Sequence, residues 1–268
     1  IKIKPDFAQA YNNMGAALRS KGDLDAAIKS YKQALKIEPE YAEVYYNMGN
    51  ALRDKGDLEA AISSYKKALQ IKPDYADAYN NMGNALKAKG DLQSAIDRYE
   101  QALKIKPDYA DAYNNMGNAL KDMGELEAAI DSYKKAIKIN TDYAEAYNNM
   151  GNAFEDKGEL EAAIDSYKKA IKIKPNYAEA FYSMGNALFY NGDPMAAVDS
   201  YRKAIKIKPD YAEAFSNVGA VLQNTGDLET AIDSYKQALQ IKPDYAEAHR
   251  HLSLVTKYEE QTQHVVQM

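Results

Sequence analysis

Cysteine and tryptophan are absent from the 268 residues of this chain, and there are only three histidines. Without cysteine there is no disulfide framework, no thiolate zinc site and no thiol nucleophile, a composition that fits a reducing, cytoplasmic location. His249, His251 and His264 are too few and too unevenly spaced to predict a metal site. We therefore expect neither a metal nor a cofactor.

Long apolar runs and an excess of positive charge are also missing. No run reaches the roughly 18 apolar residues that a membrane-spanning helix needs, and the opening residues IKIKPDF lack the apolar core of a signal peptide. The net charge of −5 disfavours nucleic acid as a partner, because binding to phosphates requires a basic face. Neither a phosphate-binding glycine loop nor a nucleophile elbow occurs, so we do not expect an enzyme.

What the chain does contain is a period of 34 residues. We count each repeat from the alanine that follows a loop aromatic residue; all 14 glycines then fall at repeat positions 8 and 15, and 19 of the 23 tyrosines at positions 4, 24 and 34. Residues 1–7 match the end of a preceding repeat, 8–245 form seven full repeats, and 246–268 form a closing helix and tail. The repeats start at Ala8, Ala42, Ala76, Ala110, Ala144, Ala178 and Ala212.

Each repeat carries two patterns of apolar and small residues with helical spacing. Between them, the glycine at position 15 can adopt a positive φ and end the first helix, and the following acid can cap the second. Every repeat is therefore predicted to be a helix–turn–helix. The glycine at position 8 lies inside the first helix, where it costs roughly 1 kcal/mol. We expect it to face the alanine at position 20, so that two small residues let the helices cross closely.

The recurring residues resemble the signature of the tetratricopeptide repeat, over residues 1 to about 256. In the third repeat they are Tyr79, Met82, Gly83, Leu86, Ala95, Tyr99, Ala102 and Pro107. Tyr79 stands where that family usually has tryptophan, and Leu86 where it often has tyrosine. The resemblance implies an all-α, right-handed superhelical solenoid with the first helices on its concave wall, and a role as a protein-interaction scaffold. Independently, no single repeat can bury its apolar face alone, so stability must come from stacking.

A polar stripe on the first helices, at positions 2, 5, 6, 9, 12 and 13, is expected to face solvent. Asparagine recurs in this stripe, and its side chain can pair with the peptide groups of any sequence. We call the following set the asparagine ladder: Asn13, Asn47, Asn81, Asn115, Asn149 and Asn217 at position 6, and Asn50, Asn84, Asn118, Asn152 and Asn186 at position 9. The asparagines at position 6 resemble those of the repeat region of O-linked N-acetylglucosamine transferase, and this resemblance implies an extended peptide in the groove. Alternatively, the amides bridge neighbouring first helices.

Some repeats depart from this pattern. The sixth has Ser183 instead of asparagine and adds Tyr182, Phe189 and Tyr190, and the second adds Tyr46. These aromatic residues are either anchors for a partner side chain or contacts with the next repeat.

Position 12 changes in charge along the chain. Arg19, Arg53, Lys87 and Lys121 give way to Glu155, Phe189 and Gln223. This order predicts a groove that is basic towards its N-terminal end, where an acidic segment of a partner could be oriented.

Two other functions stay open. The closing residues 246–268 are weakly similar to the junction before a sulfotransferase-like domain in some bacterial proteins, so the repeats could be the substrate-recruiting arm of a larger glycosyl- or sulfotransferase-like enzyme. The solenoid could also be mainly architectural and self-associate through its terminal repeats.

Overall fold

The computed structural model describes the backbone of residues 7–266 and the side chains up to Thr256. Fifteen helices and no strand occur in the part that is described, which confirms the prediction of an all-α solenoid of helix–turn–helix repeats. The chain divides into two compact units, residues 1–140 and 141–268. The predicted remnant of an earlier repeat at 1–7 lies almost entirely outside the described residues.

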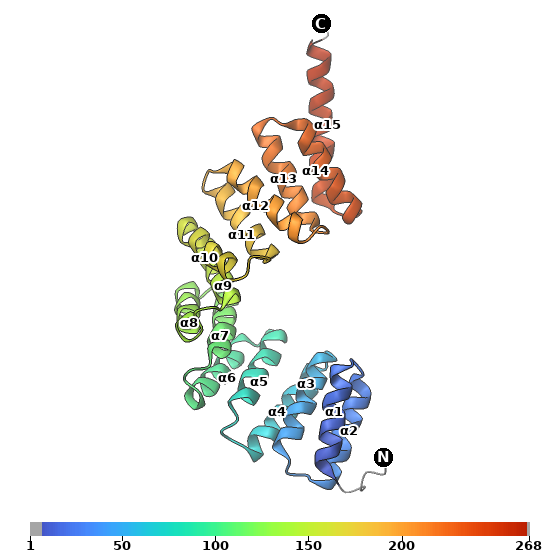
Figure 1. Ribbon diagram of the computed structural model, residues 1–268, viewed down its shortest axis with the longest axis vertical. Helices are drawn as coiled ribbons and strands as arrows, with labels where there is room; N and C mark the ends of the chain where they lie inside the picture. The colour runs from blue at the N-terminus through green and yellow to red at the C-terminus, as the bar shows by residue number, and fades with distance from the viewer. Residues whose placement is uncertain (1–6, 267–268) are drawn as a thin grey trace. The chain divides into compact units, whose positions relative to one another are not determined.

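The first unit consists of four helical hairpins (Figure 1). Its helices are α1 (Ala8–Ser20), α2 (Leu24–Ile37), α3 (Ala42–Asp54), α4 (Leu58–Ile71), α5 (Ala76–Ala88), α6 (Leu92–Ile105), α7 (Ala110–Asp122) and α8 (Leu126–Ile139). Each helix packs against the next, and α1, α3, α5 and α7 also contact one another in that order.

The second unit has three hairpins and a closing helix (Figure 1). Its helices are α9 (Ala144–Asp156), α10 (Leu160–Ile173), α11 (Ala178–Tyr190), α12 (Pro194–Ile207), α13 (Ala212–Thr225), α14 (Leu228–Ile241) and α15 (Ala246–Val266). The odd-numbered helices again contact one another, α9 with α11 and α13 with α15.

The turn inside each hairpin is built as the sequence predicts. Gly22 has a φ of 82°, and the glycines at the same position of the other six repeats also have positive φ. The Asp23 side chain then caps α2 by accepting a hydrogen bond of 3.1 Å from the Ala26 N–H. Aspartate does the same in five repeats, but the glutamates Glu125 and Glu159 make no cap bond with their side chains. The expected cap is therefore present only where the acid is aspartate.

The glycine inside each first helix has a different neighbour from the one expected. A Cβ atom built on Gly83 would lie 2.6 Å from the Tyr99 ring, and the equivalent glycine of every repeat meets the equivalent tyrosine at 2.5 to 2.8 Å. The nearest atoms are thus those of a tyrosine ring, not of the alanine at position 20. A flat ring presses against bare backbone, which explains why a residue that weakens a helix recurs seven times.

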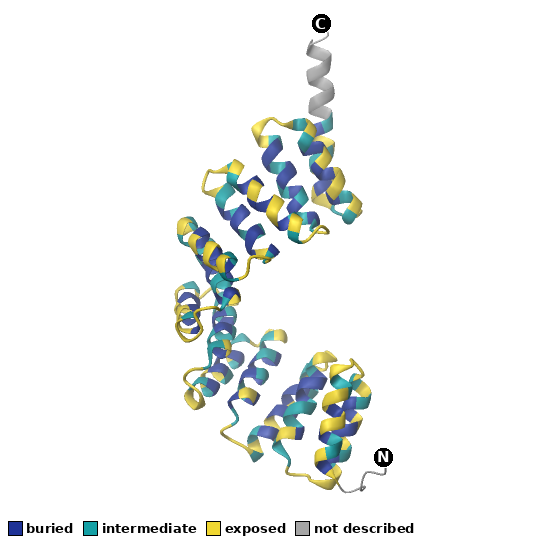
Figure 2. Cartoon of the chain, in the orientation of Figure 1, coloured by how far each residue is buried: buried dark blue, intermediate teal, exposed yellow. Residues whose placement is uncertain are grey.

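The core runs along the interior of each unit as a chain of buried alanines and tyrosines (Figure 2). Tyr31, Tyr65, Tyr99, Tyr133, Tyr167, Tyr201 and Tyr235, all at position 24, are at most 2 % exposed. The methionines at position 7 also pack into the core, except Met14 of the first repeat, which is 42 % exposed. Burial of apolar surface between neighbouring hairpins is therefore what stabilises each unit.

Two features are absent from the described residues. No helix there has the length and apolar character needed to cross a bilayer. No group of three or more metal-ligating side chains gathers there either, and His264 lies beyond the described side chains.

Candidate functional site

The asparagines at position 9 are each bonded to a buried tyrosine of the same repeat. The Tyr99 hydroxyl donates to Asn84 Oδ1 at 2.8 Å. The same bond, at the same length, joins Tyr65 to Asn50, Tyr133 to Asn118, Tyr167 to Asn152 and Tyr201 to Asn186. Burial raises the pKa of Tyr99, so its hydroxyl stays protonated and remains a donor at all ordinary pH values.

The asparagines at position 6 reach back to the preceding repeat. Where that repeat has asparagine at position 5, the amide donates to it: Asn47 Nδ2 lies 3.0 Å from Asn12 Oδ1, and Asn115 Nδ2 lies 3.1 Å from Asn80 Oδ1. These bonds join one first helix to the next. The structural alternative for the ladder is therefore present in the molecule.

A second arrangement occurs where the preceding repeat has tyrosine at position 5. Asn81 Nδ2 donates to the Tyr46 hydroxyl at 3.0 Å and to Asn50 Oδ1 at 2.9 Å. Asn217 repeats this geometry with Tyr182 and Asn186, at 3.2 and 3.0 Å. In both cases the position-6 amide N–H donates to the position-9 amide oxygen of the preceding repeat, and this bond orients both side chains.

Solvent exposure is similar at the two positions of the ladder. Asn50 at position 9 is buried, at 5 % exposed, but the other four asparagines at position 9 are half-buried, as are the position-6 side chains from Asn47 to Asn217. Asn13, in the first repeat, is exposed and accepts a bond from Gln9 at 3.1 Å. Asn149 is half-buried and also has a partner. Apart from the exposed Asn13 and the buried Asn50, the asparagines at both positions are therefore half-buried.

Position 5 does not lie on an exposed stripe, contrary to expectation. Asn12, Asn80, Asn114 and Asn148 are between 1 and 6 % exposed. They are buried because the next repeat covers this side of the first helix, which a pattern read from one helix does not show.

The ladder is interrupted at the sixth repeat. Position 6 there is Ser183, whose side chain is shorter than that of asparagine. Asn148, the residue that an asparagine at 183 would bond, has a buried Oδ1 without any hydrogen-bond partner. Ser183 lies near the Tyr167 hydroxyl instead, where it lowers the pKa of that tyrosine against the larger effect of burial. A buried acceptor without a donor is costly, so this site is a local weak point.

Of the four aromatic candidates, three are packed into the protein. Tyr46 and Tyr182 are half-buried, with ring centroids 4.8 Å from Tyr75 and 4.9 Å from Tyr211. Phe189 is half-buried as well, and its ring centroid lies 5.6 Å from that of Tyr190. Tyr190 alone is freely accessible, at 71 % exposed.

The cations at position 12 are mostly neutralised by acids at position 13 of the next repeat. Arg19 lies 2.6 Å from Asp54, and Lys87 lies 2.8 Å from Asp122. Arg53 pairs with Asp54 at 3.1 Å, and Lys121 also has a partner. Burial would raise the pKa of Asp54, but hydrogen bonds from Arg19 and Arg53 outweigh it and lower the pKa. The predicted basic end of the groove is therefore less basic than its lysines and arginines imply.

The later residues at position 12 bond to the buried tyrosines. The Tyr167 hydroxyl lies 2.7 Å from Glu155 Oε2, and the Tyr235 hydroxyl donates to Gln223 Oε1 at 2.8 Å. Burial raises the pKa of Glu155, and the nearby Asp156 adds to this, whereas the bond from Tyr167 opposes it. Sequence reasoning did not identify this contact; the only signal was that position 12 changes from a cation to an acceptor.

The spacing of helices, turn glycines and tyrosines is that of a known repeat. A family model described as the TPR repeat matches seven times, at residues 15–52, 49–90, 83–124, 117–158, 151–192, 185–226 and 224–256. The chain belongs to the TPR repeat family. Proteins built from TPR repeats are generally scaffolds for protein–protein interaction. No curated protein matches the chain.

Solved structures give the same fold. The crystal structure of MamA is 32 % identical, with a TM-score of 0.57, over 62 % of this chain and 97 % of that one. YrrB, described as a TPR protein with an unusual peptide-binding site, is 28 % identical, with a TM-score of 0.55, over 69 % of this chain and 95 % of that one. Cut9–Hcn1 of the APC/C shares the fold alone. It is 17 % identical, with a TM-score of 0.71, over 91 % of this chain and 48 % of that one. None of these matches shows the expected likeness to a glycosyl- or sulfotransferase.

Proposed function

We propose that this TPR chain is a scaffold that binds an extended segment of a partner protein along its odd-numbered helices, without catalysis and without a cofactor. The observation that carries the proposal is the position-6 amide, which is half-buried and already oriented by a bond to the preceding repeat. An asparagine side chain has two N–H groups and two acceptor lone pairs, so one bond leaves further capacity for a ligand.

The two positions of the ladder then have different roles. The position-9 amides, bonded to buried tyrosine hydroxyls, anchor the wall, and the position-6 amides contact the guest chain. Neighbouring helices lie about 10 Å apart, which matches about three residues of an extended peptide at roughly 3.3 Å each. Such a wall would hold backbone at regular intervals and discriminate sequence weakly. The likeness to YrrB, a TPR protein described as having a peptide-binding site, supports the proposal.

Tyr190 is the best candidate for a side-chain contact within this surface, because it is the one aromatic residue of the set that remains accessible. Phe189 supports it from the side. Tyr46 and Tyr182 instead serve the ladder as acceptors for Asn81 and Asn217. Arg19, Arg53 and Lys87 contribute less to binding than their charge implies, since each is already paired.

The test compares a loss of amides with a matched loss of stability. A peptide selected from a random display library on the intact chain is the probe. Replacing Asn81, Asn115 and Asn149 by alanine should weaken its binding by about tenfold or more. The control is Tyr99→Phe with Tyr133→Phe, which removes hydroxyls that bond position 9 and leaves every position-6 amide in place.

Both variants should be less stable in urea, but only the asparagine variant should lose affinity. Equal affinity losses in the two variants would mean that the amides act through stability alone, and the proposal would be abandoned. Failure to select any peptide would have the same consequence.

Self-association is a second candidate, favoured by the exposure of Phe7 and Met14 at 55 % and 42 % on the first hairpin. Solitary exposed apolar residues are common, but two on one terminal hairpin could dock on another molecule. Light scattering across a concentration series tests this: a mass that stays monomeric excludes it, and a dimer that Met14→Lys dissociates supports it.

A further inference from the structure

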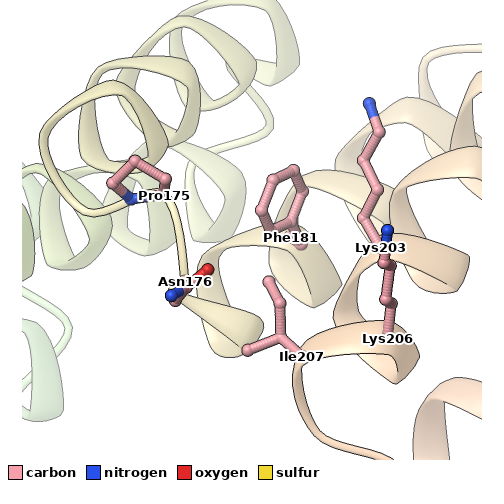
Figure 3. A pocket seen from close by; sticks show the side chains of 6 residues that line it. All are labelled: Pro175, Asn176, Phe181, Lys203, Lys206 and Ile207. Carbon is pink, nitrogen blue, oxygen red and sulfur yellow. The ribbon is translucent and has the colours of Figure 1, made fainter.

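A cavity of about 540 Å³ opens in the sixth repeat, away from the asparagine ladder. It is lined by Pro175 and Asn176 from the loop after α10, Phe181 from α11, and Lys203, Lys206 and Ile207 from α12. Phe181 and Ile207 form an apolar floor between Asn176 on one side and the two lysines on the other (Figure 3). Its volume lies within the roughly 300–1,000 Å³ typical of ligand pockets.

Equivalent cavities exist in other repeats, but they contain an acid. In the second repeat the cavity measures 450 Å³ and includes Glu40, and in the fifth it measures 380 Å³ and includes Asp142. The residue concerned is position 33 of the preceding repeat. Along the chain this position reads Glu40, Asp74, Asp108, Asp142, Asn176, Asp210 and Asp244. The cavity of the sixth repeat is thus larger than these two and lacks their carboxylate.

The cavity of the sixth repeat is positively charged, because its lining has two lysines and no acid. Lys203 and Lys206 form no ion pair with any side chain that the structure describes, and the Lys203 Nζ lies 5.8 Å from the centre of the Phe181 ring. The fifth repeat has the same two lysines, Lys169 and Lys172, but with Asp142 beside them. The seventh has Gln237, Gln240 and Asp210 at the equivalent positions. Among these three repeats, only the sixth combines two cations with no acid.

We infer that this cavity binds an acidic segment of a partner protein, with one carboxylate held by Lys203 and Lys206 and an adjacent apolar side chain on Phe181 and Ile207. The uncompensated charge selects an anion, and the aromatic floor favours an anion attached to apolar groups. A polyanion such as nucleic acid is disfavoured by the chain's net charge of −5. The cavity contains no residue of the asparagine ladder, so this binding is independent of the proposed groove.

Fluorine NMR can test the inference on the intact protein, because the chain has five phenylalanines and two of them report on the question. Phe181 is the floor of the cavity, and Phe215 holds the same position in the seventh repeat, which has no lysines there. Fluorophenylalanine labelling gives one resonance for each, and the Phe181 resonance is assigned with Phe181→Tyr, the residue found there in the first five repeats. The probe is a capped peptide of alternating glutamate and leucine.

The Phe181 resonance should shift on titration, the Phe215 resonance should not, and a glutamine–leucine peptide should leave both unchanged. Lys203→Gln with Lys206→Gln, or Asn176→Asp alone, should weaken the response by about fivefold or more. Each of these substitutions introduces the residue that the seventh repeat has at the equivalent position, namely Gln237, Gln240 or Asp210, so folding should be preserved. Conversely, Asp210→Asn with Gln237→Lys and Gln240→Lys should make Phe215 respond.

Several outcomes would overturn the inference. The first is a Phe181 resonance that does not move with the acidic peptide, or that moves equally with the neutral one. The second is an undiminished response in the lysine variant. A shift with inorganic phosphate but not with the peptide would identify a small-anion site instead. A shift that depends on protein concentration alone would identify a second copy of the chain as the occupant.

Discussion

Ser183→Asn should stabilise the second unit, because it supplies the donor that the buried Asn148 Oδ1 lacks. The expected geometry is that of Asn47 with Asn12, at 3.0 Å. A hydrogen bond to a buried acceptor that had no donor raises the free energy of unfolding by about 1–3 kcal/mol. From this we subtract roughly 1 kcal/mol for ordering a longer side chain and losing the Ser183 contact with Tyr167, whose hydroxyl keeps Asn152 as a partner. The net gain is about 1 kcal/mol, or roughly 2–4 °C in Tm.

Urea denaturation followed by far-UV circular dichroism measures this gain, and two controls identify its cause. Asn115→Ser creates the same gap opposite Asn80 and should destabilise the first unit by about 1 kcal/mol. In an Asn148→Ala background, Ser183→Asn should give no gain, because the acceptor is gone. A loss of stability in Ser183→Asn, or a gain that persists in the Asn148→Ala background, would contradict this role of the Asn148 acceptor.

Three further changes are expected to alter stability. Glu155 has a raised pKa, so the folded state holds its proton more tightly and stability should fall as pH rises from the ordinary carboxyl pKa of about 4.3 through the folded value. Glu155→Gln keeps an acceptor for Tyr167 and should remove this pH dependence of stability. It should also stabilise the protein at neutral pH by less than about 1 kcal/mol, since the group is partly exposed. An unchanged pH dependence in urea titrations would refute this. Gly83→Ala should destabilise by about 1–3 kcal/mol in spite of better helix propensity, because its Cβ would lie 2.6 Å from the Tyr99 ring; a rise in Tm would contradict the packing. Asp54 has a lowered pKa, so its contribution is present above the ordinary value of about 3.9 and is lost as pH falls through the folded one. Acid unfolding of Asp54→Asn should accordingly be less steep than that of the unchanged chain.

The repeat architecture could be predicted from the sequence because its signals are local. A glycine followed by an aspartate, as in Gly22 and Asp23, specifies a helix end and a cap within a few residues, and both are present. The period of buried tyrosines likewise marks the face that must pack. Such features depend on neighbours along the chain, so no knowledge of the third dimension was needed.

The contacts between repeats could not be predicted in the same way. Position 5 looks exposed on a single helix, yet Asn80 is buried because the next hairpin covers it. The partner of Gly83 was misassigned for the same reason, since spacing does not tell whether an alanine or a tyrosine ring from the second helix lies opposite. Whether the position-6 asparagines serve a guest chain stays a prediction, because their bonds to the preceding repeat neither require nor exclude one.

Packing within each unit joins a helix only to the next one or two along the chain, and this has a consequence for how the gene can change in length. In-frame loss or duplication of 34 codons removes or adds one hairpin without altering the surroundings of the others, provided the side chains at the new junction match. Deletion of 76–109 would bring Asn115 to the place of Asn81, where its amide could donate the same two hydrogen bonds to Tyr46 and Asn50. Variants that differ by whole hairpins should therefore fold as readily as this one and differ mainly in how long a guest segment they can accommodate.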